Sequence, residues 1–198
     1  ERSFIEAQTM KTAFKTCTFM QSKCFLNEQP LNSISEPFET NTTISEKFTQ
    51  SVEKGAVYEI QKFGGYTVER TYGTPLVKAA NKVLDLLEFQ DFESLLSSQQ
   101  LAWTSIWNTA DISIEGDIKA QQAIRFNVFQ LNQTYLGTDP QLNIGPIGFT
   151  GEKYGGSTYW DTEAYCLPFY MATKEQSAAR TLLEYRYNHL EKAIENAK

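Results

Sequence analysis

The chain contains 198 residues, of which 41% are hydrophobic and 21% are charged, and its formal net charge is −6. A chain of this length can bury the core of one or two domains. The acidic balance argues against binding to the phosphate backbone of nucleic acids. No apolar run reaches about 18 residues, so the sequence predicts no membrane-spanning helix.

The amino terminus has no initiator methionine and no charged segment followed by an apolar one, which is the pattern of a secretory signal. We therefore expect a cytoplasmic protein, and a chain that is part of a longer polypeptide. The three cysteines, Cys17, Cys24 and Cys166, lack the spacing of a metal site. Cys17 and Cys24 could be strand neighbours, but free thiols are the simpler interpretation.

Residues 10–72 are rich in Thr, Phe, Val and Tyr and alternate between apolar and polar types, which predicts antiparallel strands. The expected strands cover residues 13–20, 42–52, 56–63 and 66–72. Gly64-Gly65 is interpreted as the hairpin turn between the last two strands, and residues 27–30 and 36–37 as loops. The pattern is typical of a β-sandwich that lacks its opening strands. Its unpaired edges should need the rest of the polypeptide.

After Gly73 the pattern becomes helical. Thr74 is a capping residue and Pro75 suits the first turn of a helix, so a helix should begin there. Its apolar stripe is Leu76, Ala80, Val83 and Leu87. A second helix is expected over residues 91–108, with the stripe Phe92, Leu96, Trp103 and Ile106.

Asp117 should cap a third helix that ends near residue 136. Its apolar stripe is Ala120, Ile124, Val128, Leu131 and Tyr135. Further helices are expected over residues 162–171, interrupted at Pro168, and over residues 174–198. The stripe of the last region is Ala179, Leu183, Leu190, Ile194 and Ala197.

Residues 149–163 combine a glycine-rich loop, several aromatic residues and the pair Trp160-Asp161. Glycines allow the backbone to approach a ligand closely. An aromatic ring beside a carboxylate suits a sugar, whose C–H faces stack and whose hydroxyl groups donate hydrogen bonds. The alternative is an ordinary surface loop closed by a buried Trp160. Arg125, on the third helix, lines either a pocket or a solvated face.

Six short segments of the carboxyl-terminal half carry a more specific pattern. They are residues 112–117 (ISIEGD), 123–127 (AIRFN), 148–156 (GFTGEKYGG), 159–163 (YWDTE), 180–188 (RTLLEYRYN) and 193–197 (AIENA). In combination they resemble the disaccharide phosphorylases of glycoside hydrolase family 65, and most of all the members of that family that act on maltose. Residues 110–198 carry the specific part of the resemblance, whereas residues 1–109 are compatible with it and less diagnostic.

The resemblance implies a multidomain β + α fold: the end of an antiparallel β-sandwich, then linker helices, then the first helices of an (α/α)6 barrel. Residues 1–73 would be part of the N-terminal β-sandwich. Residues 74–110 would be the helical linker, and residues 111–198 the start of the catalytic barrel. The order of strands and helices read from the residues agrees with this arrangement.

The implied reaction is the reversible phosphorolysis of maltose to β-glucose 1-phosphate and glucose, with inversion at the anomeric carbon. Inorganic phosphate takes the place of the water molecule used by an inverting glycosidase. Because phosphate is already a nucleophile, one carboxylic acid is enough and no carboxylate base is needed. The implied partners are a glucosyl disaccharide, phosphate as co-substrate, the remainder of the polypeptide and a second subunit of a homodimer; no other cofactor and no metal are expected.

By position, Trp160 and Asp161 match the pair that holds the glucosyl unit in the donor subsite of this family. Arg125, Phe149 and Tyr154 are weaker candidates for the surrounding pocket. Glu163 is not assigned as the general acid, because the general acid and the phosphate-binding residues of the family lie later in the barrel. We therefore expect no catalytic residue within this chain.

Two alternatives to maltose phosphorolysis remain at this stage. The first is a non-catalytic carbohydrate-binding or helical interaction module on the same scaffold. The second is a phosphorylase for kojibiose, nigerose or trehalose, because the acceptor site of the family is built largely by other residues.

Overall fold

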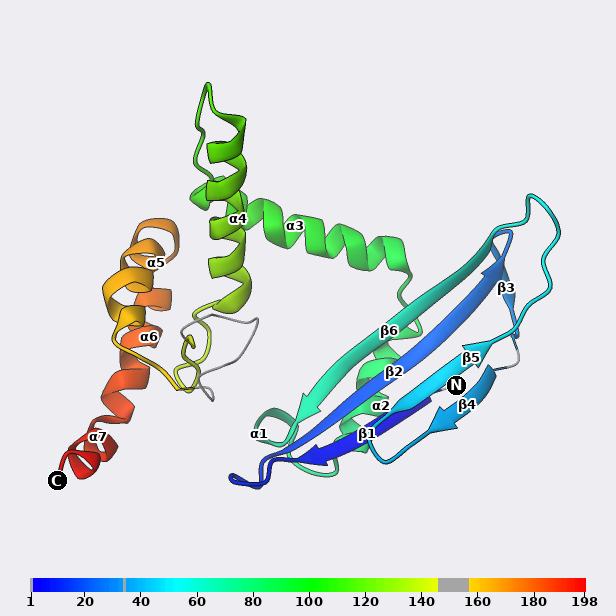
Figure 1. Cartoon of the computed structure of the whole chain (residues 1–198), viewed down its shortest axis with the longest axis horizontal. Coiled ribbons are helices and arrows are strands. Elements are labelled where there is room, and N and C mark those ends of the chain that lie inside the picture. The colour runs from blue at the N-terminus through cyan, green and yellow to red at the C-terminus, as the bar shows by residue number, and fades with distance from the viewer. Residues whose placement is uncertain (1, 34, 146–156) are drawn as a thin grey trace. The chain divides into compact units, whose positions relative to one another are not determined.

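The computed structural model describes residues 2–33, 35–145 and 157–198 (Figure 1). The chain divides into two compact units, Glu1–Ser97 and Ser98–Lys198. The strands are β1 (Arg2–Gln8), β2 (Lys15–Leu26), β3 (Gln29–Leu31), β4 (Ser35–Glu39), β5 (Ile44–Phe48) and β6 (Tyr58–Val68). The helices are α1 (Glu69–Tyr72), α2 (Leu76–Leu87), α3 (Phe92–Ala110), α4 (Ile118–Thr134), the π-helical turn η1 (Thr162–Cys166), α5 (Leu167–Thr173), α6 (Gln176–Asn188) and α7 (Leu190–Asn196).

The predicted order of an antiparallel sheet followed by helices is confirmed. Within the part of the chain that the structure describes, no helix is both long and apolar enough to cross a membrane.

Strand β2 is the centre of a four-stranded antiparallel sheet (Figure 1). It pairs with β6 from Thr16 opposite Val68 to Leu26 opposite Tyr58. Its other edge pairs with β1 and, further along, with the short β3. Strands β4 and β5 form a separate antiparallel pair. Strand β1 lies before the segment in which the sequence predicts strands, so the sheet is larger than expected.

The predicted hairpin at Gly64-Gly65 is wrong, because β6 runs unbroken through both residues. The reason is a contact with the neighbouring strand. A Cβ atom at Gly65 would lie 2.8 Å from Cζ of Phe19, and one at Gly64 would lie 3.3 Å from the carbonyl oxygen of Phe19. The two glycines therefore make room for a neighbouring strand and its aromatic ring, which is the second common use of glycine within a strand.

The loops predicted in the first unit are also revised. Residues Asn27 and Glu28, both with positive φ, form the turn between β2 and β3. The following Gln29 and Pro30 belong to β3 rather than to the loop. The loop predicted at residues 36–37 is wrong, because both residues lie in β4, where Pro37 pairs with Glu46. Proline is tolerated there because β4 is an edge strand that needs fewer backbone donors.

Substitution of Gly65 with alanine should destabilise the first unit by about 1 to 2 kcal/mol, the usual range for overpacking. The Phe19 ring that the new methyl group would meet is only 4% exposed and cannot move freely. Hydrogen exchange of peptides from β2 and β6 measures the effect. In a Phe19→Leu background the cost of Gly65→Ala should shrink; an equal cost in both backgrounds would contradict the steric explanation.

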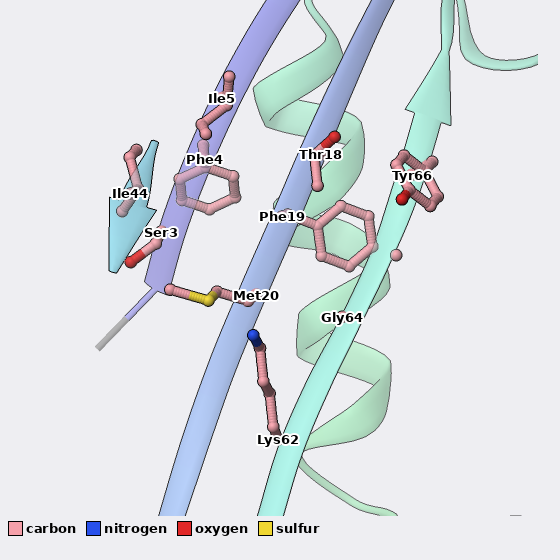
Figure 2. Close-up of a pocket in the computed structure, with 11 residues that line it drawn as sticks. Ser3, Phe4, Ile5, Thr18, Phe19, Met20, Ile44, Lys62, Gly64 and Tyr66 are labelled. Carbon is pink, nitrogen blue, oxygen red and sulfur yellow. The ribbon is translucent and has the colours of Figure 1, made fainter. Parts of the chain in front are cut away.

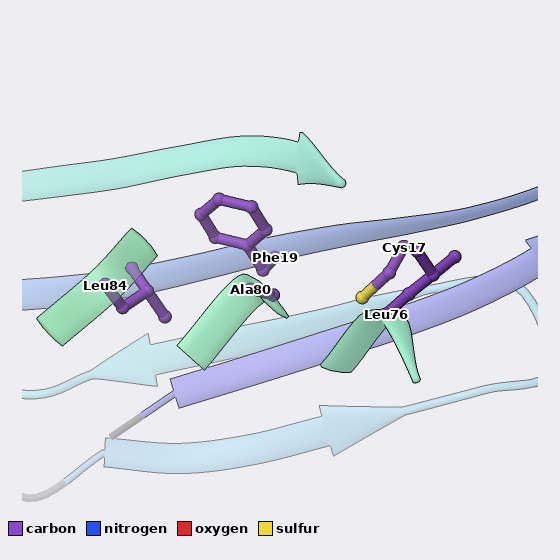
Figure 3. Close-up of a cluster of buried hydrophobic side chains, with 5 residues drawn as sticks. All are labelled: Cys17, Phe19, Leu76, Ala80 and Leu84. Carbon is purple, nitrogen blue, oxygen red and sulfur yellow. The ribbon is translucent and has the colours of Figure 1, made fainter. Parts of the chain in front are cut away.

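Helix α2 packs on one face of the sheet, and the hydrophobic core of the first unit lies between them (Figure 3). The buried cluster consists of Cys17, Phe19, Leu76, Ala80 and Leu84. Of the predicted stripe, Leu76 and Ala80 are buried, while Val83 and Leu87 pack at the margin. The predicted cap at Thr74 is one residue out of place, because Pro75 is the cap residue and makes no side-chain cap bond.

Polar contacts hold the two ends of α2. The buried Thr67 hydroxyl donates to the Leu76 carbonyl oxygen at 3.1 Å. The guanidinium of Arg2 on β1 donates to Asn81 Oδ1 at 2.9 Å, to Asp85 Oδ1 at 2.7 Å and to Glu88 Oε1 at 2.6 Å. These contacts set the register of the helix on the sheet.

The cysteines are free thiols, as the simpler interpretation predicts. Cys17 and Cys24 lie on the same strand, β2, and are seven positions apart. An odd separation along a strand places two side chains on opposite faces of the sheet.

In the second unit, the predicted cap of α4 is confirmed, because Oδ1 of Asp117 accepts from the backbone N–H of Ala120 at 3.0 Å. The core of this unit contains Tyr135, Ile144, Tyr170 and Leu182. Burial raises the pKa of the Tyr135 phenol to about 12 and that of Tyr170 further still. Both hydroxyls therefore stay protonated and donate to backbone carbonyl oxygens, Tyr170 to Leu131 at 2.9 Å and Tyr135 to Ala178 at 3.4 Å.

Several predicted apolar stripes are not buried by the described residues. Phe92 of α3 is 52% exposed, and Leu183, Leu190 and Ile194 of the last helices are about half exposed. In α6 the buried positions are Ala178, Ala179 and Leu182, so the prediction is right for Ala179 and wrong by one position for Leu183. The face that a helix buries depends on its neighbours, which the periodicity of one segment does not identify.

The predicted interruption at Pro168 takes a different form. The chain is helical from Thr162 to Thr173, and Pro168 lies in the first turn of α5. Helical conformation thus continues from η1 through the proline into α5. The irregularity is the wide π-helical turn η1, which precedes the proline.

Candidate functional site

The Trp160-Asp161 pair lies at the start of η1, with both side chains exposed. The indole of Trp160 is 68% exposed, so the interpretation of a loop closed by a buried tryptophan is wrong. Its ring centroid is 6.1 Å from that of Tyr165. The next residue, Thr162, is buried and donates from its hydroxyl to the Ile144 carbonyl oxygen at 3.2 Å. The buried Thr162 thus fixes the chain to the interior directly after two residues, Trp160 and Asp161, whose side chains are exposed.

The first turn of η1 is closed by the carbonyl oxygen of Trp160, which accepts from the N–H groups of Glu163 at 3.1 Å and Ala164 at 3.0 Å. Isolated π-helical turns within helices occur frequently at functional sites, because the extra residue redirects a side chain. Sequence periodicity did not reveal this turn. The π-helical turn begins directly after the Trp160-Asp161 pair.

Arg186 of α6 binds the segment around the pair at three residues. Its Nε donates to Glu163 Oε1 at 2.8 Å and its Nη2 to Glu163 Oε2 at 3.1 Å. Its Nη1 donates to the Thr158 hydroxyl at 2.8 Å, and its Nη2 also donates to the Tyr159 carbonyl oxygen at 2.5 Å. The Arg186 and Glu163 side chains are 34% and 24% exposed.

The sequence analysis missed Arg186, because 23 positions separate it from Glu163 and no local pattern joins them. The structure also explains the position of Glu163. Both of its carboxylate oxygens accept from the Arg186 guanidinium, so its hydrogen-bonding positions are occupied within the chain, which supports leaving Glu163 out of the role of general acid.

Arg125 of α4 makes a bidentate ion pair with Asp111, at 2.8 Å and 2.6 Å. The hydrogen bonds from Arg125 hold the pKa of the Asp111 carboxyl below its usual range. Gln121 also binds the segment between α3 and α4, since its side-chain amide donates to the Ile112 carbonyl oxygen and accepts from the Ile114 N–H. Arg125 therefore holds the start of this interhelical segment at Asp111. Among the described residues, no hydrogen bond or ring contact joins it to Trp160 or Asp161.

Two other predicted site residues, Phe149 and Tyr154, lie outside the residues that the structure describes. Elsewhere in the second unit, Trp103 of α3 stacks on Phe129 of α4 with a centroid distance of 4.9 Å. Trp103 belongs to the apolar stripe predicted for α3 and is partly buried.

The first unit contains a cavity of about 420 Å³ along β1, β2 and β6, with Ile44 at its rim (Figure 2). In this view α2 lies behind the strands. Among the described residues, the lining is mostly apolar and includes one charged side chain, Lys62, and no carboxylate. A hydrolase-type or phosphorylase-type site needs a carboxylic acid, so this cavity does not have the composition of a sugar-cleaving site.

The second unit contains a cavity of about 630 Å³ beside the junction of α5 and α6. Its polar lining residues are Ser105, Thr109, Thr138, Thr173, Lys174, Glu175 and Ser177. Burial lowers the pKa of the Lys174 amine, which lies 6.0 Å from the centre of the Tyr170 ring. Its lining does not include Trp160 or Asp161.

Within residues 2–33, 35–145 and 157–198, no group of three or more His, Cys, Asp or Glu side chains is placed to hold a metal ion.

Each half of the chain matches a domain of a known protein family. Residues 1–106 match the N-terminal domain of glycosyl hydrolase family 65, and residues 125–198 match the central catalytic domain of the same family. The chain belongs to glycosyl hydrolase family 65. The resemblance found in the carboxyl-terminal segments is therefore confirmed, and it extends over the amino-terminal half as well.

Relatives within family 65 are disaccharide phosphorylases. The chain is 40% identical over 195 residues, 98% of its length, to maltose phosphorylase of Bacillus subtilis. It is 38% identical over 147 residues, 74% of its length, to α,α-trehalose phosphorylase of Thermoanaerobacter brockii. It is 37% identical over 163 residues, 81% of its length, to kojibiose phosphorylase of Caldanaerobacter subterraneus.

A solved structure of a family 65 protein shows the same fold. It is a human-microbiome protein assigned as a kojibiose phosphorylase, which matches 96% of the chain with a TM-score of 0.74 and 27% identity. The family 65 chain described here spans only 24% of that structure and 25%, 19% and 21% of the three relatives. It thus corresponds to between about a fifth and a quarter of their length.

Proposed function

We propose that the chain is part of an inverting disaccharide phosphorylase that converts maltose and phosphate to β-glucose 1-phosphate and glucose. The observation that carries the proposal is the 40% identity to a maltose phosphorylase over 98% of the chain. The membership of both halves in family 65 supports the same class of reaction.

In this proposal the chain contributes the donor subsite, and other parts of the polypeptide contribute the general acid and the phosphate-binding residues. Phosphate attacks the anomeric carbon from one face while the acid protonates the departing oxygen on the other, which inverts the configuration. The glucosyl unit must be held firmly during this displacement, because reaction requires an in-line approach of the nucleophile.

Trp160 and Asp161 are the proposed contacts to the glucosyl unit. Both side chains are exposed, and the backbone beneath them is held by Thr162 and Arg186. The indole offers an apolar face to the C–H groups of the sugar, and the carboxylate accepts from its hydroxyl groups. Arg125, Phe149 and Tyr154 are proposed as surrounding residues with smaller roles.

The domain boundaries belong to the same proposal. Residues 1–73 would complete a β-sandwich, residues 74–110 would link it to the barrel, and residues 111–198 would begin the (α/α)6 barrel. A homodimer in the cytoplasm is the expected form, and no metal or organic cofactor takes part.

The direct test is to incubate the complete protein with maltose and inorganic phosphate. We expect β-glucose 1-phosphate and glucose in equal amounts, with the anomer identified by the proton NMR coupling at C1. Release of the α-anomer, or of glucose without the phosphate ester, would contradict the inverting phosphorolysis.

Related specificities are the second candidate function, because relatives named trehalose and kojibiose phosphorylases match most of the chain. Kojibiose, nigerose and trehalose should therefore be tested beside maltose under identical conditions. Maltose should have the highest kcat/KM. A higher value for another disaccharide would replace maltose in the proposal, and inactivity toward all four would reject the phosphorylase assignment.

A further inference from the structure

The segment that carries Trp160 and Asp161 is held from the side by a single side chain of α6. Arg186 contacts Thr158 and Tyr159 before the pair and Glu163 after it. Arg186 therefore binds the chain on both sides of Trp160 and Asp161. None of the residues that Arg186 binds belongs to the proposed donor subsite itself.

The hydrogen-bonding capacity of Arg186 is almost fully used. A guanidinium has five N–H donors in a rigid fork, and the structure assigns four bonds to them, two to Glu163, one to Thr158 and one to Tyr159. The charge is balanced by Glu163, with which it shares the bidentate geometry. A group so occupied is poorly suited to bind phosphate or sugar directly, and well suited to hold a backbone in place.

The helix that carries Arg186 is itself anchored in the core. Leu182, one turn before Arg186, is fully buried, and Ala178 and Ala179 are buried on the same helix. Because α6 is fixed in the core, the hydrogen bonds of Arg186 fix the segment at residues 158–163 relative to that core. On the inner side the same segment is held by the Thr162 hydroxyl on Ile144.

We propose that Arg186, through Glu163, Thr158 and Tyr159, is a positioning residue for the donor subsite and determines how tightly the glucosyl unit is bound. This inference rests on the proposed function. Arg186 does not touch the substrate; it fixes the backbone from which Trp160 and Asp161 extend. Displacement of a substrate-binding group by about 1 Å can lower the rate roughly a hundredfold.

The chain offers a matched control on the same helix. Arg180 also makes an ion pair, with Glu184 at 2.8 Å, but its side chain is 80% exposed and the pair lies within α6. The test compares Arg186→Met with Arg180→Met in the complete protein. A further variant, Arg186→Lys, keeps the charge and loses the fork that reaches several acceptors at once.

The informative measurement is the reverse reaction, because it separates the donor from the acceptor. For Arg186→Met we expect the KM for β-glucose 1-phosphate to rise by roughly tenfold or more. In the same variant, the KM for the acceptor glucose, and the KM for phosphate in the forward direction, should change less than about twofold. Arg186→Lys should give an intermediate value, and Arg180→Met should match the unaltered protein.

A purely structural role would have a different signature. It would lower the fraction of active protein, so kcat would fall for every substrate while each KM stayed unchanged. That result, or equal behaviour of Arg186→Met and Arg180→Met in an active enzyme, would overturn the positioning role and leave the proposed function intact. Inactivity of the unaltered protein would overturn both.

A second variant keeps the test decisive if Arg186→Met does not fold. Glu163→Gln preserves the size of the side chain and removes the charge that orients the guanidinium. It should raise the KM for β-glucose 1-phosphate in the same selective way. An unchanged KM for the donor in a folded Glu163→Gln variant would reject the proposal.

Discussion

Replacement of Asp161 with alanine in the complete protein should lower kcat/KM for maltose by roughly a hundred- to a thousandfold. The loss follows from the removal of a carboxylate that accepts hydrogen bonds from sugar hydroxyls. Such charge-assisted bonds are about twice as strong as neutral ones. Steady-state kinetics with maltose and phosphate measures the effect.

The structure indicates that this substitution leaves the fold intact. Asp161 occupies the cap position of η1, yet its side chain makes no capping hydrogen bond, and it is exposed. The segment keeps its anchors at Thr162 and Arg186. The circular dichroism spectrum and the midpoint of thermal unfolding should therefore match those of the unaltered protein.

Two further variants define the control for Asp161. Asp161→Asn keeps the shape and a carbonyl acceptor but removes the charge, and should retain more activity than alanine. Glu191→Ala removes an exposed carboxylate from α7 and should have no effect on kcat/KM. Near-normal phosphorolysis by Asp161→Ala would refute the assignment of the donor subsite.

Substitution of Gly137 with alanine should destabilise the second unit by about 2 to 4 kcal/mol, because steric and backbone costs add. Gly137 has φ of +79°, a conformation that favours glycine. An added Cβ atom would lie 2.6 Å from Cα of Ala178 and closer still to its Cβ. Ala178 is buried in α6, so neither backbone can move without disturbing the core.

Gly116 provides the matched control for Gly137. It too has a positive φ, +86°, but an added Cβ atom would meet nothing within 4 Å. Gly116→Ala should therefore cost only about 1 kcal/mol, the backbone part alone. Hydrogen exchange of peptides from α4 and α6 separates the two variants. Equal protection in both would show that the close approach to Ala178 has no energetic weight.

The features that sequence reasoning predicted correctly are local ones. The Asp117 cap and the apolar stripe of α2 depend on residues within one or two turns of each other, so the spacing of neighbouring residues is sufficient to identify them. The family resemblance likewise rests on short contiguous segments. Its agreement with the family models shows how much information those segments carry.

The predictions that failed required contacts between distant segments. Gly64-Gly65 has the composition of a turn, yet both residues lie in the middle of β6. Phe19 on the neighbouring strand leaves no room for a Cβ atom at Gly65 and little at Gly64. The apolar stripes of α3 and α7 are real patterns, yet the surfaces that would cover them are not supplied by the described residues.

The candidate site shows the same division. Composition and order along the chain were enough to single out Trp160 and Asp161 and to place an antiparallel sheet before helices, because both are properties of neighbouring residues. Only the folded chain brought Arg186 onto the segment around that pair, and only there did the π-helical turn and the buried Thr162 become visible. The physical reason is that a guanidinium bonds to the acceptors that lie near it in space, and a separation of 23 positions along the chain leaves that distance undetermined until the helices have packed.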